Sequence, residues 1–151
     1  MSEARPITIL IADDDAEDRE LAQRGLRAAR LDNDLRFVCD GEELMDYLLR
    51  RGKYTDPASS PRPGLLLLDL QMPKRDGFSC LRELRTNPTL RTLPVVVLTT
   101  SSAETDVFRS YDLGVNSYIT KPVTFARLSA AMQAIAEYWF RIVELPGEAA
   151  P

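Results

Sequence analysis

The sequence predicts an α/β fold in which one parallel β-sheet is covered by helices on both faces. Short apolar runs rich in branched residues, such as residues 7–12 and 65–68, are typical of strands buried on both faces. Segments with the apolar spacing of amphipathic helices follow these runs, which gives five β–α repeats. We therefore expect a single domain over residues 1–145 and a disordered tail over residues 146–151.

Five strands and five helices are expected to alternate along the chain. The strands are predicted over residues 7–12, 35–39, 65–68, 95–98 and 117–119. The helices are predicted over residues 17–29, around residues 44–48, from residue 78 onward, over residues 101–114 and from residue 124 to about residue 143. Residues 51–64 contain three prolines and two glycines, so they are expected to form a long loop.

Capping residues mark the expected helix starts. Asp40 is followed three residues later by Glu43, and Ser101 by Glu104, which is the capping-box pattern. Thr124 is expected to cap the last helix. These positions fix where the chain leaves each strand end and turns back over the sheet.

The composition excludes several classes of function. The net charge is −4 and the pI is about 4.9, which disfavours direct binding to nucleic acid. The chain contains no histidine, which excludes Ser-His-Asp and Cys-His catalysis and the histidine zinc motifs. Because no apolar run is long enough for a membrane span and residues 1–6 lack a signal-peptide stretch, we expect a cytoplasmic protein that contacts no membrane. Cys39 and Cys80 lie in apolar patterns and are expected to be buried free thiols.

Polar side chains gather at the carboxyl ends of the expected strands, where open parallel sheets bind their ligands. They are Asp13 and Asp14 after the first strand, Asp69 after the third, Thr99 at the end of the fourth and Lys121 after the fifth. In the flavodoxin-like strand order 2-1-3-4-5, the first and third strands are neighbours, which would bring the three aspartates together. Grouped carboxylates repel one another unless a cation neutralises them, so the sequence predicts a divalent metal site.

These motifs resemble the receiver domain of two-component response regulators. The matching residues are Asp13 and Asp14, the segment from Asp69 through Met72 and Pro73 to Gly77, Thr99, Tyr118, and Lys121 with Pro122. The resemblance covers residues 7–142. The long proline-rich loop and the aromatic-rich last helix also look like the receivers that serve bacterial phytochrome kinases.

The resemblance implies a role for each site residue. Asp69 would accept a phosphoryl group from a phosphohistidine on a partner sensor histidine kinase, of the bacteriophytochrome type. Mg²⁺ would be held by Asp14, Asp69 and the backbone carbonyl of Gln71, with Asp13 binding through a metal-bound water. Lys121 would offset the remaining phosphoryl charge, and the resemblance also implies a cis peptide before Pro122.

The same resemblance implies a switch. The Thr99 hydroxyl would move to a phosphoryl oxygen and Tyr118 would turn inward behind it, changing the surface of the fourth helix, fifth strand and fifth helix. Apolar residues that lie off the core-facing stripe of the last helix predict a homodimer through this region, with plain partial exposure as the alternative: Tyr138, Phe140, Val143 and Leu145.

Other interpretations remain open at this point. Asp15, Glu17 and Asp18 are interpreted as helix N-terminal residues rather than site residues. An aspartyl-nucleophile phosphatase of the haloacid dehalogenase type would carry its acids two residues apart, whereas Asp13 and Asp14 are adjacent. A flavin or nucleotide carrier would cradle phosphate on an uncharged first loop, and here that loop is acidic. The favoured interpretation is a binding switch that is controlled by phosphorylation and is not a turnover enzyme. The main alternative is an interaction module that works without phosphorylation.

Overall fold

The computed structural model describes residues 7–28, 33–100, 103–122 and 124–138. The strands are β1 (Thr8–Ala12), β2 (Leu35–Val38), β3 (Pro63–Leu68), β4 (Val95–Thr99) and β5 (Ser117–Thr120). The α-helices are α1 (Ala16–Ala28), α2 (Gly41–Leu49), α3 (Gly77–Thr86), α4 (Glu104–Asp112) and α5 (Phe125–Glu137), and two 3₁₀ helices are η1 (Gly52–Tyr54) and η2 (Pro57–Ser59).

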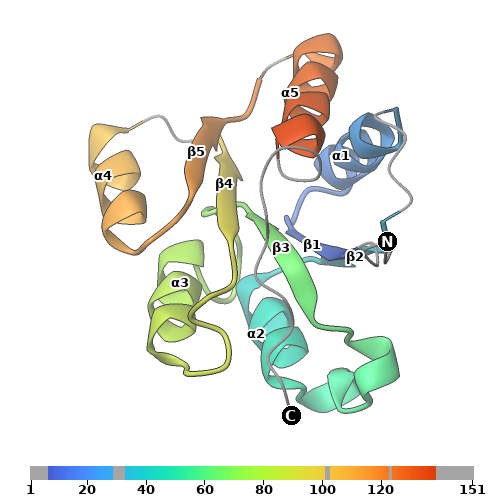
Figure 1. Ribbon diagram of the computed structural model, residues 1–151. Helices are drawn as coiled ribbons and strands as arrows, with labels where there is room; N and C mark the ends of the chain where they lie inside the picture. The colour runs from blue at the N-terminus through green and yellow to red at the C-terminus, as the bar shows by residue number, and fades with distance from the viewer. Residues whose placement is uncertain (1–6, 29–32, 101–102, 123, 139–151) are drawn as a thin grey trace, which may run out of the picture.

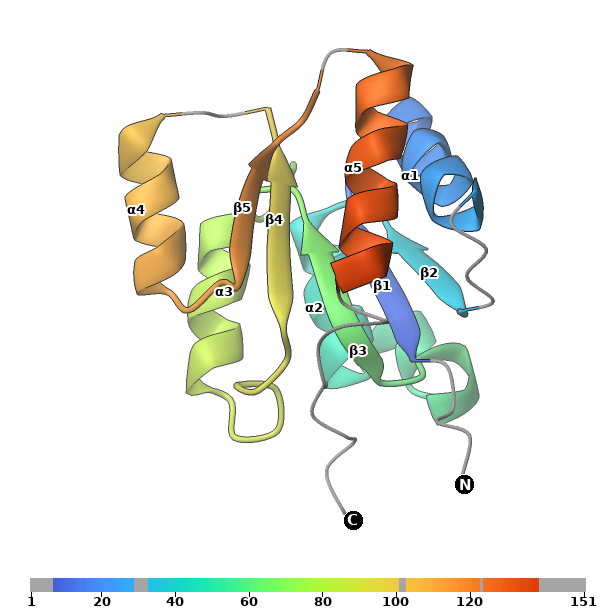
Figure 2. The ribbon, with the colours of Figure 1, turned by 45° about the horizontal axis from the view of Figure 1, so that its top comes forward.

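The strands form one parallel sheet in the order β2-β1-β3-β4-β5, which confirms the predicted order 2-1-3-4-5 and the flavodoxin-like (βα)₅ fold. Helices α1 and α5 pack together on one face, and α2, α3 and α4 lie on the other (Figure 1, Figure 2). This arrangement follows from right-handed β–α–β crossovers. Because the handedness is constant, the face that a helix covers depends on the direction in which the chain steps from one strand to the next across the sheet. All five strands therefore point their carboxyl ends to one edge.

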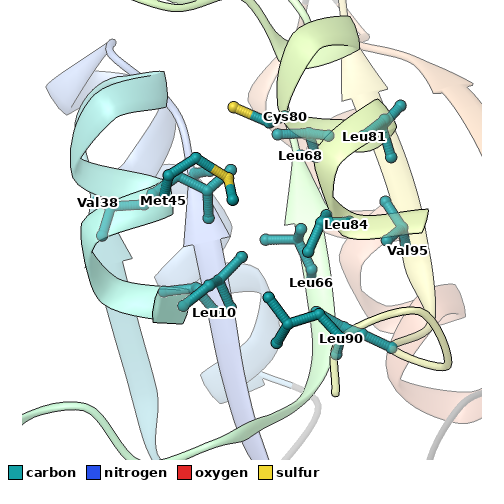
Figure 3. Close-up of a cluster of buried hydrophobic side chains, with 14 of the residues drawn as sticks. Leu10, Val38, Met45, Leu66, Leu68, Cys80, Leu81, Leu84, Leu90 and Val95 are labelled. Carbon is teal, nitrogen blue, oxygen red and sulfur yellow. The ribbon is translucent and has the colours of Figure 1, made fainter. Parts of the chain in front are cut away.

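Two apolar layers hold the helices to the sheet. The larger lies under α2 and α3, and Figure 3 shows its side chains converging between these helices and the central strands. Its labelled members are Leu10, Val38, Met45, Leu66, Leu68, Cys80, Leu81, Leu84, Leu90 and Val95. The second layer lies under α1 and α5, where Leu26 of α1 and Met132 of α5 are buried. Alternate residues of each strand serve opposite layers, which is why the central strands β1, β3 and β4 are predominantly apolar.

The capping predictions have mixed outcomes. Asp40 caps α2 by accepting a hydrogen bond from the Glu43 amide at 2.7 Å, and Thr124 caps α5, as predicted. Ser101 lies outside the described residues, and the N-cap of α4 is Ala103, whose side chain accepts no hydrogen bond. The capping box proposed for α4 is therefore wrong.

The segment between α2 and β3 is more ordered than the predicted loop. It contains η1 and η2, and β3 begins at Pro63, a position that tolerates proline because it is the first residue of the strand. The Tyr47 hydroxyl donates to the Pro61 carbonyl at 2.6 Å, and the Tyr54 hydroxyl donates to the Glu43 carboxylate at 2.7 Å. These bonds fasten the segment to α2.

Two further expectations are corrected by the structure. Cys80 is buried but Cys39 is exposed, because Cys39 follows the last residue of β2, where the chain has already left the covered part of the sheet. The described residues contain no cis peptide, so the Lys121–Pro122 bond is trans, the form that X-Pro bonds favour by about 0.5–1 kcal/mol. The predicted continuation of α5 to residue 143 and the tail over residues 146–151 lie outside the described residues. Within the described part of the chain, no helix is long and apolar enough to cross a membrane.

Candidate functional site

The predicted site residues meet at the carboxyl edge of the sheet. The register pairs Ala12 of β1 with Leu68 of β3, so the next residues, Asp13 and Asp69, are neighbours. The Asp69 amide donates to the Ala12 carbonyl at 3.0 Å, which extends the pairing to the acidic residues themselves. The sequence prediction for Asp13, Asp14, Asp69, Thr99 and Lys121 is confirmed as a spatial cluster, since hydrogen bonds or short carboxylate distances join all five.

Three carboxylates form the acidic centre of the site. Asp13, Asp14 and Asp69 each place a carboxylate oxygen within 4.8 Å of the others. Asp13 and Asp69 are buried, whereas Asp14 is exposed. Burial raises the pKa of the Asp13 carboxyl, and the opposing hydrogen bonds from Lys121 and from the Asp15 amide do not return it to its ordinary value. The site thus concentrates negative charge where water is scarce.

Lys121 supplies the positive charge that this centre needs. Its Nζ atom lies 2.6 Å from Asp13 Oδ2, 2.8 Å from Asp18 Oδ2 and 2.9 Å from Asp69 Oδ2. The Lys121 side chain is 7% exposed. Burial alone lowers the pKa of this ammonium, but the hydrogen bonds to the three carboxylates outweigh it, and the pKa is raised above its ordinary value. Lys121 therefore stays charged and occupies the centre as an internal cation.

Asp69 is held on both of its carboxylate oxygens. Oδ1 accepts hydrogen bonds from the fully buried Thr99 hydroxyl at 2.8 Å and from the Gln71 amide at 3.0 Å. Oδ2 faces the Lys121 ammonium. Such an aspartate is oriented by its surroundings, and charge added at either oxygen would meet a donor that is already in place.

The contacts of Asp18 and Thr100 are among those that have no counterpart in the sequence prediction. Asp18, interpreted as a helix N-terminal residue, binds Lys121 across 103 residues of chain. The Thr100 hydroxyl bonds to the Gln71 side-chain oxygen at 2.6 Å and so links the ends of β4 and β3 beside Asp69. An acidic residue in a first helical turn has an ordinary local explanation, and no sequence signal separated Asp18 from Glu17.

Tyr118 belongs to β5, the edge strand beside β4. It is half-buried on β5 and packs against the apolar layer under α2 and α3. Its amide donates to the Tyr111 hydroxyl of α4 at 3.2 Å. Tyr118 thus links β5 to α4, and its predicted switching movement stays a prediction.

The donor set fits a hard divalent cation. Three carboxylates from two neighbouring strand ends supply only oxygen ligands, which is the preference of Mg²⁺. The Lys121 ammonium, bound to two of the three, shows that the centre attracts positive charge. The Gln71 carbonyl, predicted as a further ligand, belongs to the loop that directly follows Asp69, and its role stays a prediction.

Comparison with known proteins identifies this arrangement. Residues 9–133 match the family model described as the response regulator receiver domain. The chain belongs to this family. The receiver fold accounts for the sheet order and for the acidic residues at its carboxyl edge, and the placement speaks against the haloacid dehalogenase and flavin-carrier alternatives.

The chain also resembles individual receivers over almost its whole length. It is 43% identical to response regulator Rcp1 from Synechocystis sp. over 141 residues, which is 93% of this chain and 94% of that protein. The crystal structure of the Mn²⁺-bound form of Rcp1 superposes with a TM-score of 0.87 at 42% identity, covering 94% of this chain and 100% of the other. The phosphorylated cyanobacterial phytochrome response regulator RcpA superposes with a TM-score of 0.88 at 40% identity, covering 95% and 100%. This receiver is therefore related to phytochrome response regulators.

Proposed function

We propose that this receiver accepts a phosphoryl group on Asp69 from a sensor histidine kinase of the bacteriophytochrome type. The supporting observation is the geometry of Asp69, a buried carboxylate in contact with a hydroxyl donor, an ammonium and two further aspartates. The kinase class is supported by the likeness to RcpA, a phytochrome response regulator. These 151 residues contain no histidine, so the phosphohistidine donor must lie outside them.

The residues divide the work of the transfer. A carboxylate oxygen of Asp69 attacks the phosphorus, the P–N bond to the donor imidazole breaks, and an acyl phosphate forms on Asp69. The Thr99 hydroxyl and the Lys121 ammonium, 2.8 Å and 2.9 Å from the Asp69 oxygens, are within reach of the new phosphoryl oxygens. Mg²⁺ held by Asp13, Asp14, Asp69 and the Gln71 carbonyl would offset the charge of the phosphoryl group.

The proposed output is a change in protein binding rather than turnover of a metabolite. Movement of Thr99 toward the phosphoryl group would draw Tyr118 inward and shift α4 against β5, since the Tyr118 amide is bonded to Tyr111 of α4. Slow self-dephosphorylation would reset the switch. We propose that the protein acts in the cytoplasm, without membrane or nucleic acid as a partner.

Labelling by a small phosphodonor tests the acceptor directly. After incubation with acetyl phosphate and Mg²⁺, intact-mass spectrometry should find one added phosphoryl group on the wild-type protein and none on Asp69→Asn. Asp76→Asn is the matched control, because Asp76 lies in the same loop but only caps α3, so it should be labelled like the wild type. Equal labelling of Asp69→Asn would remove Asp69 as acceptor, and an unlabelled wild type would favour a phosphorylation-independent interaction module.

We also propose that the receiver forms a homodimer through α4, β5 and α5. Large apolar side chains are exposed in this region, with Phe108 of α4 76% exposed and Tyr138 after α5 51% exposed. An apolar groove runs between β5 and α5, lined by Val96, Ser117, Ile119, Ala131, Ala134, Ile135 and Tyr138. A second copy would cover such a surface.

Sedimentation velocity checks the dimer. The wild type should sediment as a dimer at micromolar concentration, and Phe108→Ser should shift it toward monomer because a large apolar contact is lost. Arg36→Ser on β2, at the opposite edge of the sheet, should not change the sedimentation coefficient. A wild type that is monomeric both with and without beryllofluoride and Mg²⁺ would contradict the proposal.

A further inference from the structure

Asp18 makes a contact that its place in the helix does not explain. Acidic residues in a first helical turn usually serve the helix dipole, and Glu17 beside it is exposed in that way. The Asp18 carboxylate instead lies 2.8 Å from Lys121 Nζ, and its side chain is 28% exposed. An ammonium has three hydrogen-bond donors, and Lys121 gives one each to Asp13, Asp18 and Asp69.

The three partners of Lys121 are not equivalent. Asp13 and Asp69 belong to the group of carboxylates that can hold a divalent cation, and Asp18 does not. A cation that enters this group competes with the ammonium for Asp13 and Asp69 and repels it. The bond to Asp18 is the one that such a cation leaves intact. Asp18 lies in the first turn of α1, where the helix dipole favours a negative charge.

We propose that Asp18 is a positioning residue that holds Lys121 at the edge of the site while a divalent cation occupies the aspartates. Asp18 lets the ammonium release Asp13 and Asp69 without leaving the site. The ammonium then remains where an incoming phosphoryl oxygen arrives. This inference rests on the proposed function, because it assigns how the same site accommodates both Mg²⁺ and Lys121.

Removal of Asp18 should strengthen the competition between Lys121 and Mg²⁺. In Asp18→Asn the ammonium has only Asp13 and Asp69 as charged partners, so Mg²⁺ must displace it from both at once. Loss of the negative charge of Asp18 also weakens Mg²⁺ binding directly, because the Coulomb attraction between the two ions is lost whether or not Lys121 is present. The two effects separate in a double-mutant cycle, since only the first one requires Lys121.

Isothermal titration with Mg²⁺ measures this cycle. With Lys121 present, Asp18→Asn should raise the Kd for Mg²⁺ about tenfold, and in a Lys121→Met background the same substitution should raise it by about threefold or less. Glu17→Gln, which removes the same charge from the same helical turn without a contact to Lys121, should change the Kd by less than about twofold. Equal effects of Asp18→Asn in both backgrounds would overturn the inference.

A second measurement follows Lys121 itself and needs no Lys121 variant. The chain has only three lysines, Lys53, Lys74 and Lys121, so side-chain NMR of ¹⁵N-lysine-labelled protein resolves them simply. In the wild type and in Glu17→Gln, the Lys121 ammonium signal should remain protected when Mg²⁺ is added. In Asp18→Asn it should become solvent-exchanged, like the signals of the exposed Lys53 and Lys74. An identical Mg²⁺ response in wild type and Asp18→Asn would overturn the role of Asp18.

The outcomes distinguish the inference from the proposed function. A wild type that binds no Mg²⁺ and accepts no phosphoryl group would defeat both. A wild type that binds Mg²⁺ and is labelled on Asp69, together with an Asp18→Asn variant that behaves like Glu17→Gln in both measurements, would defeat the role of Asp18 alone.

Discussion

Replacement of Lys121 by methionine is expected to lower the free energy of unfolding by about 3 kcal/mol when divalent cations are absent, because a buried ion cluster loses the ammonium that bridges its carboxylates. Lys121, Asp13 and Asp69 each have side chains that are 7% exposed, so water screens the remaining carboxylates poorly. For a chain of this size, such a loss corresponds to a decrease in Tm of roughly 6–12 °C. Methionine keeps most of the side-chain volume, which limits the change to charge.

Mg²⁺ should reverse most of this loss. We expect the ion to bind the folded carboxylate cluster and not the unfolded chain, so that saturating Mg²⁺ stabilises the variant by mass action. Urea unfolding in EDTA and in Mg²⁺, followed by circular dichroism, measures both effects. Lys74→Met is the control, since Lys74 is 64% exposed and lies 3.7 Å from Asp40, and such a surface pair contributes at most about 1 kcal/mol. A Lys121→Met variant as stable as wild type in EDTA would show that Lys121 does not neutralise the cluster.

Gly41→Ala is expected to destabilise the fold by about 3 kcal/mol, although alanine is normally the better helix former. A Cβ atom at Gly41, the first residue of α2, would lie 1.8 Å from the carbonyl oxygen of Arg75. The atoms that the Cβ would meet first belong to the backbone of the loop after Asp69, so the clash cannot be relieved by turning a side chain. The gain in helix propensity, about 1 kcal/mol, is smaller than the cost of separating these segments.

The consequence of Gly41→Ala should reach the site. The Gly41 amide donates to the Pro73 carbonyl at 3.4 Å, and this loop also carries Gln71, whose amide orients Asp69. Displacement of the loop should therefore weaken Mg²⁺ binding as well as stability, and both can be followed by thermal unfolding with and without Mg²⁺. Glu42→Ala, one residue further along the same helix and exposed, should leave both unchanged. A Gly41→Ala variant more stable than wild type would show that the two segments are not in fixed contact.

Most of the residues that form the site could be predicted from local sequence patterns. Asp13, Asp14, Asp69, Thr99 and Lys121 were predictable as neighbours, because each follows or ends an apolar strand and parallel strands end at a common edge. The hydrogen bonds of Asp69 to Thr99 and Lys121 then follow from proximity. Two predictions made from local patterns alone were wrong, namely the burial of Cys39 and the N-cap of α4. Cys39 is exposed because it follows the last residue of β2, where the chain has left the covered part of the sheet. The N-cap of α4 is Ala103 rather than Ser101.

Arg85 shows a contribution that the sequence could not indicate. Its guanidinium donates to four backbone carbonyls, those of Arg91, Leu93, Leu113 and Gly114, and so ties the end of α3 to the approaches of β4 and β5. Burial lowers the pKa of this guanidinium. In the sequence, Arg85 is a basic residue in a last helical turn, where a dipole effect is explanation enough.

By itself the sequence determined the fold, the edge of the sheet at which the polar residues lie and the five residues that gather there. Apolar periodicity and β–α alternation can both be recognised within short segments of the chain. The tertiary structure alone decided that Lys121 divides its hydrogen bonds among Asp13, Asp18 and Asp69, that Arg85 joins three segments, and that α2 starts against the Arg75 carbonyl. A charged or small residue does not encode its partner. Its contacts are fixed only when the packed sheet brings distant segments within a few ångströms of it.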